Sequence, residues 1–524
     1  MSPSLTRCSL ALIAVLGLGC TGPAADRAPS RPPIQLTTAE AFDASTVAPY
    51  AGDHGSVYRY IDANLPKHLA NIQRWLRQPS VSAQNLGIQQ MAELVRDDYK
   101  KLGCQTSELV PTSGHPGIFA SCDYGAAKTL LVYMMYDVQP VEPADWRSPP
   151  FAGAVVDHEH GKVLMGRGAT NQKGPERSFL NALESIIAVE GKLPVNLMFV
   201  AEGEEELGSP NFPEVIAKYR DRLKQASGVL FPFLSQDPSG AVSMFMGVKG
   251  ILYFELEAKG GDWGGPTQAE IHGSYKAIVD SPVWRLIQAL ATLTTPDGNV
   301  ITVPGYYDAI RQPSDEEQRL LNGLLKEWVT REPLQQKSLG VKQWIDGWTG
   351  KDAQLQYLFT TTLNVDGFGA GYTGEGTKTI LPHRALAKVD SRLVPNQHPD
   401  SQLALIRRHL DSLGFTDIAI KKLSGYPPAQ SSVEAALVQA AIGVYRKHGI
   451  TPTVSPRIAG SAPYYVFTDL LELPIVSGGI GFGTGAHAPN EIMLVEPKAG
   501  AKVAGLAAQE KFFVDFLFAL ANSK

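Results

Sequence analysis

The chain has 524 residues, enough for two or three domains, and 44% of them are hydrophobic while 19% are charged. This balance is typical of a folded globular protein, and a net charge of −5 without a basic run argues against nucleic-acid binding. No apolar stretch reaches the roughly 18 residues that a membrane-spanning helix needs.

The N-terminus has the pattern of an export signal. A basic residue precedes an apolar run over residues 10–18, which ends shortly before Cys20. This ending is similar to the cleavage site of bacterial lipoproteins, although Gly17 stands where an aliphatic residue is usual. We therefore predict a signal peptide over residues 1–20, lipidation of Cys20, and a location in the periplasm or anchored to a bacterial membrane. Residues 21–52 are rich in Ala, Pro, Ser and Thr, which predicts a flexible linker.

Two helices and a hairpin begin the folded part. Apolar positions at helical spacing predict helices over residues 60–77 and 84–102. A turn at residues 113–116 lies midway between two predicted strands, one beginning at Cys104 and one ending at Cys122, so the hairpin brings these cysteines opposite each other. Export permits a disulfide between them, but two buried free thiols are an equally good interpretation.

Strands then alternate with helices. Apolar runs predict buried strands at residues 130–137, 195–201 and 229–233, and helices are expected at about 174–189 and 211–224. This alternation predicts an α/β domain whose central sheet is mostly parallel and is covered by helices on both faces.

The pattern changes after Gly247 and returns near residue 425. Between them we expect strands at 251–258, 377–381, 385–393 and 417–422, helices at 281–296 and 399–413, and an irregular polar region with Pro304, Pro313 and Pro333. Afterwards we expect helix 432–447, strand 473–477 and helix 498–521. An inserted α+β domain (248–424) would thus divide an α/β domain into two parts, 53–247 and 425–524.

The predicted strand at 195–201 leads into an acidic turn. Four carboxylates lie within five residues: Glu202, Glu204, Glu205 and Glu206. Open α/β sheets carry their functional sites at such strand ends. Because neighbouring carboxylates repel each other, a bound cation or a carboxylate acting as a base would explain their concentration. A solvated acidic turn before a helix N-terminus explains it equally well.

Five motifs occur in one order and carry a family resemblance. They span residues 136–140, 166–174, 202–209, 388–396 and 487–491. Together they resemble the co-catalytic di-zinc exopeptidases, which include carnosinase-type dipeptidases, aminoacylases and succinyl-diaminopimelate desuccinylases, and above all the carnosine dipeptidase branch. The resemblance covers about residues 60–520. It implies an α/β fold with a zinc-exopeptidase-like catalytic domain and an inserted α+β lid and dimerisation domain.

The resemblance also implies roles for single residues on the metal side. In the family, two zinc ions share a bridging carboxylate and activate a water, and a Glu passes the water's proton to the leaving amine. By position, Glu205 resembles this base and Asp137 resembles the Asp that orients the first metal ligand. Glu206 and His487 resemble metal ligands.

Further residues resemble the family's substrate contacts. Arg392 resembles the clamp for the substrate carboxylate, a role that suits the planar guanidinium. Thr379, Gly460 and Ser461 match other substrate contacts. His272 resembles a histidine that reaches the active site of a partner subunit and stabilises the oxyanion, which implies a homodimer.

Three of the family's metal ligands are replaced. Met135 stands in place of a His, Asn171 in place of the bridging Asp, and Phe233 in place of a later Asp. Met135 and Phe233 remove both private ligands of the first zinc, since a thioether is a poor zinc ligand and a phenyl ring is none. The second zinc keeps Glu206 and His487, with Asn171 as a weak third ligand. We therefore expect at most one well-ligated zinc ion, or none.

Two functions agree with this combination of retained and replaced residues. The first is a hydrolase of dipeptides or N-acyl amino acids with one metal ion or a rearranged site. The second is a non-catalytic exported relative that binds a peptide-like ligand or a partner protein. The three replacements favour loss or strong alteration of di-zinc hydrolysis. Without metal charge, one of Glu205 and Glu206 should hold a proton at neutral pH.

Overall fold

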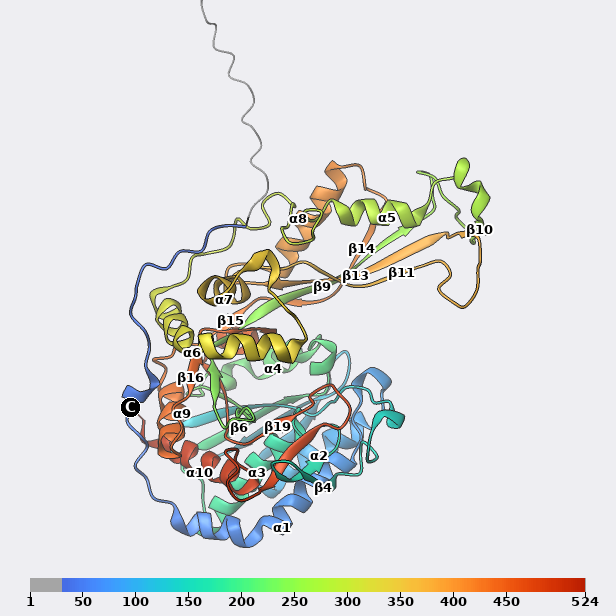
Figure 1. Ribbon diagram of the computed structural model, residues 1–524. Coiled ribbons are helices and arrows are strands. Elements are labelled where there is room, and N and C mark those ends of the chain that lie inside the picture. The colour runs from blue at the N-terminus through green and yellow to red at the C-terminus, as the bar shows by residue number, and fades with distance from the viewer. Residues whose placement is uncertain (1–30, 524) are drawn as a thin grey trace, which may run out of the picture.

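The structure is a computed structural model that describes residues 31–523. The predicted signal peptide, Cys20 and the first part of the predicted linker lie outside the described residues. No helix among residues 31–523 is long and apolar enough to span a bilayer. Figure 1 shows a lower body built on a central sheet and an upper arm that carries a second, elongated sheet.

A six-stranded sheet forms the centre of the lower body. In spatial order its strands are β1 (Thr106–Val110), β2 (Gly117–Cys122), β6 (Asn196–Glu202), β3 (Thr129–Met135), β7 (Val229–Pro232) and β18 (Ile475–Gly478). β6, β3, β7 and β18 run parallel, whereas β1 and β2 form an antiparallel hairpin at one edge. The predicted α/β domain with a mostly parallel sheet is confirmed.

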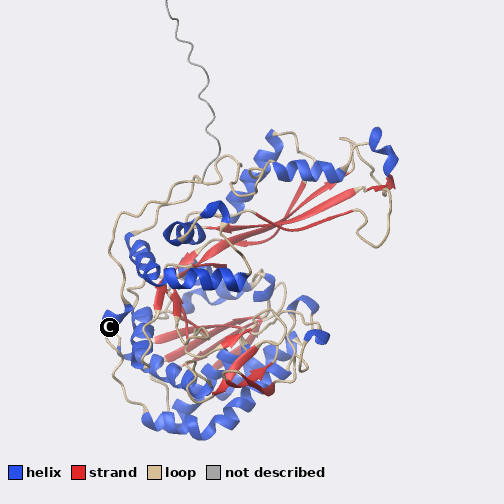
Figure 2. Ribbon diagram, in the orientation of Figure 1, coloured by secondary structure: helices blue, strands red, loops and turns tan. Residues whose placement is uncertain are grey.

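Helices cover both faces of this sheet, as Figure 2 shows. One face carries α1 (Gly55–Arg77), α2 (Ile88–Lys101), α3 (Lys173–Glu190), α9 (Ala436–Lys447) and α10 (Leu506–Asn522). The other face carries α4 (Phe212–Leu223) and the short π-helix η7 (Val466–Leu470). Each face packs into its own apolar cluster. The parallel strands are therefore buried on both sides, as their continuous apolar sequences require.

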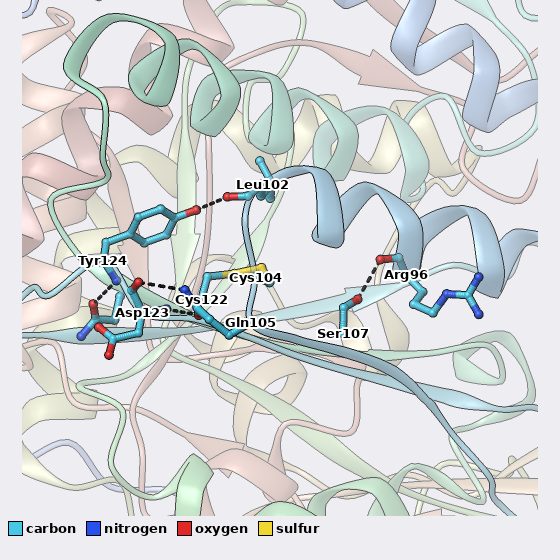
Figure 3. Close-up of a disulfide and its surroundings, with 9 residues drawn as sticks. Arg96, Leu102, Cys104, Gln105, Ser107, Cys122, Asp123 and Tyr124 are labelled. Carbon is cyan, nitrogen blue, oxygen red and sulfur yellow. Dashed lines mark hydrogen bonds between the residues drawn. A yellow bond between two sulfur atoms is a disulfide. The ribbon is translucent and has the colours of Figure 1, made fainter.

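Cys104 and Cys122 form a disulfide, shown in Figure 3. It joins the residue that follows α2 and its turn to the last residue of β2. Beside it, the Tyr124 hydroxyl donates a hydrogen bond to the Leu102 carbonyl. Of the two interpretations that the sequence left open, the structure contains the disulfide.

A four-stranded antiparallel sheet lies beside the acidic turn and was not predicted. Its order is β19 (Gly483–Thr484), β20 (Ile492–Pro497), β5 (Gly161–Met165) and β4 (Ala154–His158). Residues 138–165 were predicted to form a loop. This prediction is wrong for residues 154–165, which form the hairpin β4–β5. This sheet brings the chain after β5 against the end of the loop before β20, where Gly166 N donates to Glu491 O at 3.0 Å.

The upper arm is the predicted inserted α+β domain. Its sheet has the antiparallel order β11 (Asn364–Ala370), β13 (Arg384–Leu393), β9 (Gly247–Lys259) and β14 (Ala419–Tyr426). Helices α5 (Pro282–Ala291) and α8 (Pro399–Ser412) cover one face. Short strands β10 (Ile271–His272) and β12 (Ile380–Leu381) pair at its far tip. Where the arm meets the body, β15 (Ala429–Gln430) and β17 (Ile458–Ser461) pair with β9, and β8 (Ser243–Phe245) pairs with β16 (Thr453–Ser455).

The region predicted to be irregular contains two helices, α6 (Asp315–Leu339) and α7 (Gly350–Phe359). Ser314 and Glu317 form a capping box that begins α6. Pro333 lies inside this helix. Buried residues such as Leu320 and Leu321 pack on its inner face, and this tertiary packing outweighs the local cost of the proline.

The described part of the predicted linker, residues 31–52, lies along both parts of the molecule, as the dark blue segment in Figure 1 shows. Phe42 N donates to Arg319 O of α6 at 2.9 Å, and Tyr50 N donates to Gly443 O of α9 at 2.9 Å. Backbone hydrogen bonds to two separate helices hold this segment in place, which composition alone did not indicate.

Candidate functional site

The residues predicted for the metal side converge at the carboxyl ends of β3 and β6. Glu205 and Glu206 lie in the short helix η4 (Glu205–Leu207), which follows β6. A Cβ atom at Gly203 would lie 2.5 Å from the Tyr136 ring, so only glycine lets the acidic turn pack this closely against the end of β3. Asn171 comes from the loop before α3, and His487 from the loop between β19 and β20.

Asp137 is fully buried and holds the backbone of the acidic turn. Its Oδ1 accepts the N–H of Glu205 and its Oδ2 accepts the N–H of Glu206, both at 3.1 Å. The Ser82 hydroxyl also donates to Oδ2, at 2.8 Å. Burial, followed by the charge of Glu206, raises the pKa of Asp137 to about 7.

Glu206 lies among three polar side chains of the same chain. Asn171 Nδ2 donates to Oε1 at 2.9 Å, and Gln139 Nε2 donates to Oε2 at 2.8 Å. His487 Nε2 lies 3.2 Å from Oε2 and 3.1 Å from Asn171 Nδ2. The hydrogen bond to Glu206 raises the pKa of His487. The structure thus brings together all three residues predicted as metal ligands, and they contact one another directly.

Glu205 and Glu202 share the desolvated interior of this turn. Burial, reinforced by the charges of Glu206 and Asp137, raises the pKa of Glu205 well above its ordinary value. Burial likewise raises the pKa of Glu202 to about 8, although the Tyr133 hydroxyl donates to its Oε1 at 2.7 Å. This upward direction is the one that the sequence led us to expect for neighbouring carboxylates without a metal charge.

Met135 and Phe233 pack into one apolar cluster. Met135 is the last residue of β3 and is buried, with its backbone N–H donating to Glu176 Oε1 at 2.8 Å. Phe233 follows β7 and lies at the edge of the same cluster. Asp237, the next acidic residue along the chain, accepts hydrogen bonds within its own turn instead. Across residues 31–523, no three His, Cys, Asp or Glu side chains lie where they could hold a metal ion together.

Glu491 positions Asn171 and had no role assigned from the sequence. It is fully buried, and its Oε1 accepts the backbone N–H groups of Thr170 and Asn171, each at 2.8 Å. Arg167 Nη1 donates to its Oε2 at 2.9 Å. Glu491 and Gln139 both lie inside motifs that carried the family resemblance. Their position in these motifs was the only sequence signal that could have indicated a role in the site.

The predicted substrate-side residues form a second group around Arg392. Arg392 lies on β13 and donates from Nε to Asp390 Oδ1 at 3.1 Å and from Nη1 to Ser461 Oγ at 3.0 Å. Gly460 and Ser461 belong to β17, whose pairing with β9 carries them to the base of the arm. The structure therefore brings together Arg392, Gly460 and Ser461.

Tyr426 is a buried aromatic residue at the base of the arm. It ends β14, and its ring stacks on Tyr465 with the centroids 6.0 Å apart. Burial and the charge of Glu205 raise the pKa of Tyr426, whereas the charge of Arg392 lowers it.

His272 and Thr379 lie outside both groups. His272 Nε2 is 3.5 Å from Thr379 Oγ1, at the tip where β10 pairs with β12. Figure 1 shows this tip at the far end of the arm. Arg392 lies at the other end of β13, roughly 26 Å along the strand at its usual rise per residue. In a single chain these two predicted site residues are therefore remote from the acidic turn.

Comparisons with known proteins agree with this geometry. A model of peptidase family M20/M25/M40 matches residues 131–506. The Beta-Ala-His dipeptidase of Rattus norvegicus is 26% identical over 477 residues, which cover 84% of this chain and 92% of the rat protein. The Cys-Gly metallodipeptidase dug1 of Schizosaccharomyces pombe is 27% identical over 464 residues, 83% and 93% of the two chains. The solved structure of an M20 family metallo-carboxypeptidase from Sulfolobus solfataricus has a TM-score of 0.77 and 34% identity, and the match covers 87% of this chain and 99% of that chain.

Proposed function

Because the chain belongs to peptidase family M20/M25/M40, we propose that it binds dipeptides or N-acyl amino acids by their free carboxylate without hydrolysing them. It would hold one zinc ion at most and not the zinc pair that the family resemblance implies. The similar proteins are named as dipeptidases for Beta-Ala-His and Cys-Gly, which supports a short peptide-like ligand.

The observation that carries the proposal is the contact between Asn171 and Glu206. At the position of the bridging carboxylate, Asn171 presents its NH2 group to Glu206 Oε1 at 2.9 Å. An N–H donor has no lone pair for a cation, whereas a carboxylate at this position could bridge two ions. Asn171 can offer a cation only its neutral carbonyl oxygen, which is a weak zinc ligand, so Glu206 and His487 are the two strong donors. Zinc sites in proteins generally use three or more protein ligands. The donor set therefore does not fit a zinc pair.

The packing of Met135 and Phe233 supports the same conclusion. Both side chains belong to the apolar cluster on the α4 face of the sheet. Their burial stabilises the fold without metal, whereas two free ligand groups at these positions would repel or require solvation. The proposal accordingly assigns these residues a packing role.

The group around Arg392 supports carboxylate recognition. Asp390 and Ser461 hold the guanidinium by its Nε and Nη1 atoms, which fixes the plane of the fork before a ligand arrives. We further propose a homodimer, in which the arm tip with His272 and Thr379 reaches the ligand of the other subunit. Export and attachment through Cys20 remain part of the proposal.

A hydrolase with a single metal ion is the second candidate. It is favoured by the pair Glu206 and His487, two ligand types that zinc accepts, 3.2 Å apart. Glu205, beside them, stands where the family resemblance implies a general base.

Calorimetry and turnover separate the two candidates. N-acetyl amino acids are titrated into the full-length protein with and without EDTA, and a panel of dipeptides is incubated with added zinc. The proposal predicts equal binding in both conditions and no hydrolysis. Hydrolysis that EDTA abolishes, at one zinc per chain, would instead support the second candidate. The same activity at two zinc ions per chain contradicts both.

A further inference from the structure

A cavity of about 760 Å³ lies beside Arg392. Its walls come from α6, the short helix η6 (Ile345–Gly347), α7, the segment 360–364 and the end of β13. This volume lies within the range of pockets that hold small organic ligands. The cavity is separate from the acidic turn, and its lining includes Arg392 and Asp390 at one end.

Aromatic side chains form much of the wall. Three of the chain's seven tryptophans line the cavity, together with Tyr357: Trp328, Trp344 and Trp348. Trp344 Nε1 donates to Glu332 Oε1 at 2.8 Å, which fixes the orientation of its ring. The guanidinium of Arg31 lies 4.5 Å from the centroid of Trp348 and is also part of the lining. A wall of this kind favours flat or bulky apolar groups.

Large apolar side chains around this cavity are left in contact with solvent. Leu339, Ile345 and Tyr357 are 59%, 50% and 50% exposed. Each of them lines the cavity. Grouped apolar surface of this kind gains free energy when a ligand covers it, and in soluble proteins such surface marks binding sites.

The cavity and the Arg392 clamp form one hydrogen-bonded unit. Thr362 N donates to Arg392 O at 3.2 Å, and Thr361 Oγ1 donates to the same oxygen at 2.7 Å. Lys249 Nζ donates to Thr360 O at 2.6 Å from the base of the arm. The segment that walls the cavity is thus bonded to the strand that presents the guanidinium. One ligand can therefore contact the cavity wall and the Arg392 guanidinium at the same time.

We infer that this cavity takes an aromatic or other bulky apolar side chain of the same ligand whose carboxylate binds Arg392. The inference rests on the proposed function and narrows it to peptides or N-acyl amino acids that carry such a side chain on the residue with the free carboxylate. Arg31 and Arg392 place positive charge at the cavity, which disfavours lysine and arginine side chains.

The test compares N-acetyl-L-phenylalanine with N-acetylglycine by isothermal titration calorimetry on the full-length protein. The phenyl group should tighten binding about tenfold or more, from the apolar area that it buries. Trp348→Ala and Tyr357→Ala should each remove most of this advantage. Trp284→Ala is the matched control, because Trp284 is 57% exposed on α5 and does not line the cavity.

The outcomes separate the inference from the proposed function. A tenfold preference that depends on Trp348 or Tyr357 supports both. Equal binding of the two compounds, or a preference that survives both cavity substitutions, overturns the inference and leaves carboxylate recognition intact. Binding of neither compound overturns the proposed function itself. Tyr357 is half exposed, so its substitution keeps the test informative if Trp348→Ala fails to fold.

Discussion

The two groups of site residues differ in the space that lies beside them. The Glu206 carboxylate makes polar contacts with three side chains of the same chain: Asn171, Gln139 and His487. Around Arg392, a guanidinium that is 36% exposed borders an aromatic cavity of about 760 Å³. Arg392 is also paired, with Asp390 and Ser461, but it borders a cavity from which a ligand can approach it. This contrast supports the proposal that the chain recognises a ligand but does not hold a zinc pair.

The largest expected effect comes from restoring the first group. The triple variant Met135→His, Asn171→Asp and Phe233→Asp should bind zinc about 100-fold more tightly than the native chain, because it supplies both private ligands and the bridging carboxylate. Competition with a chelating dye measures this affinity. The variant Met135→Leu, Asn171→Ala and Phe233→Leu is the matched control and should gain nothing. If the restored chain gains nothing either, these three residues do not occupy the ligand positions.

The next effect breaks the second group. Arg392→Ala should weaken the binding of N-acetyl amino acids about 10- to 100-fold, since a charged hydrogen bond contributes about 1.5–3 kcal/mol. Arg392→Lys keeps the positive charge but loses the planar guanidinium. Its affinity for N-acetyl amino acids should therefore lie between that of the native protein and that of Arg392→Ala. Calorimetry provides both constants. Native affinity in Arg392→Ala would mean that the carboxylate binds elsewhere.

A smaller effect sharpens the contrast within the first group. Asn171→Asp places a carboxylate against Glu206 Oε1, where Nδ2 now donates at 2.9 Å. The metal-free variant should lose about 1–3 kcal/mol of unfolding free energy at pH 7. Repulsion raises the folded-state pKa of the new carboxyl, so the loss of unfolding free energy should grow as pH rises from about 4 through that pKa. The loss should therefore be smaller at pH 5 than at pH 7. Urea unfolding at both pH values checks this, with Asn171→Ala as the control. An equal loss at the two pH values would contradict the electrostatic explanation.

The smallest expected effect is a pH dependence of ligand affinity that comes from Lys249, whose Nζ donates to Thr360 O near Arg392. Burial, followed by the charges of Arg457 and Arg392, lowers the pKa of Lys249 to about 7. A carboxylate bound at Arg392 favours the protonated amine. Affinity should therefore be highest below pH 7 and fall about two- to fivefold as pH rises to 8. Calorimetry at pH 6 and 8 tests this, and Lys249→Met should flatten the profile. An unchanged slope in Lys249→Met would assign the effect to another group.

Sequence patterns predicted the body of the fold well because its strands are continuous apolar runs and its helices have amphipathic spacing. They failed over residues 315–339, where Pro333 suggested irregular structure but the capping box and buried leucines form α6. The hairpin β4–β5 was also missed, since its short strands are stabilised by pairing with β20, far along the chain. Such long-range pairing leaves little local signal.

The structure brings together the three residues predicted as metal ligands, but the contacts among them were not predicted. Position in the motifs identified Glu206, Asn171 and His487, and the structure brings them together. Asn171 donates to Glu206 from a loop that Glu491 holds by a hydrogen bond to the Asn171 backbone. No local sequence pattern indicates this long-range contact. The aromatic cavity was not predicted either, because its walls come from segments as distant in sequence as Arg31 and Arg392.

We propose that this chain does not hold the zinc pair of its family. The most direct measurement is the zinc content of the full-length protein, determined by elemental mass spectrometry after dialysis against excess zinc and removal of the unbound metal. We expect no more than one zinc ion per chain. Two tightly bound zinc ions per chain would contradict it.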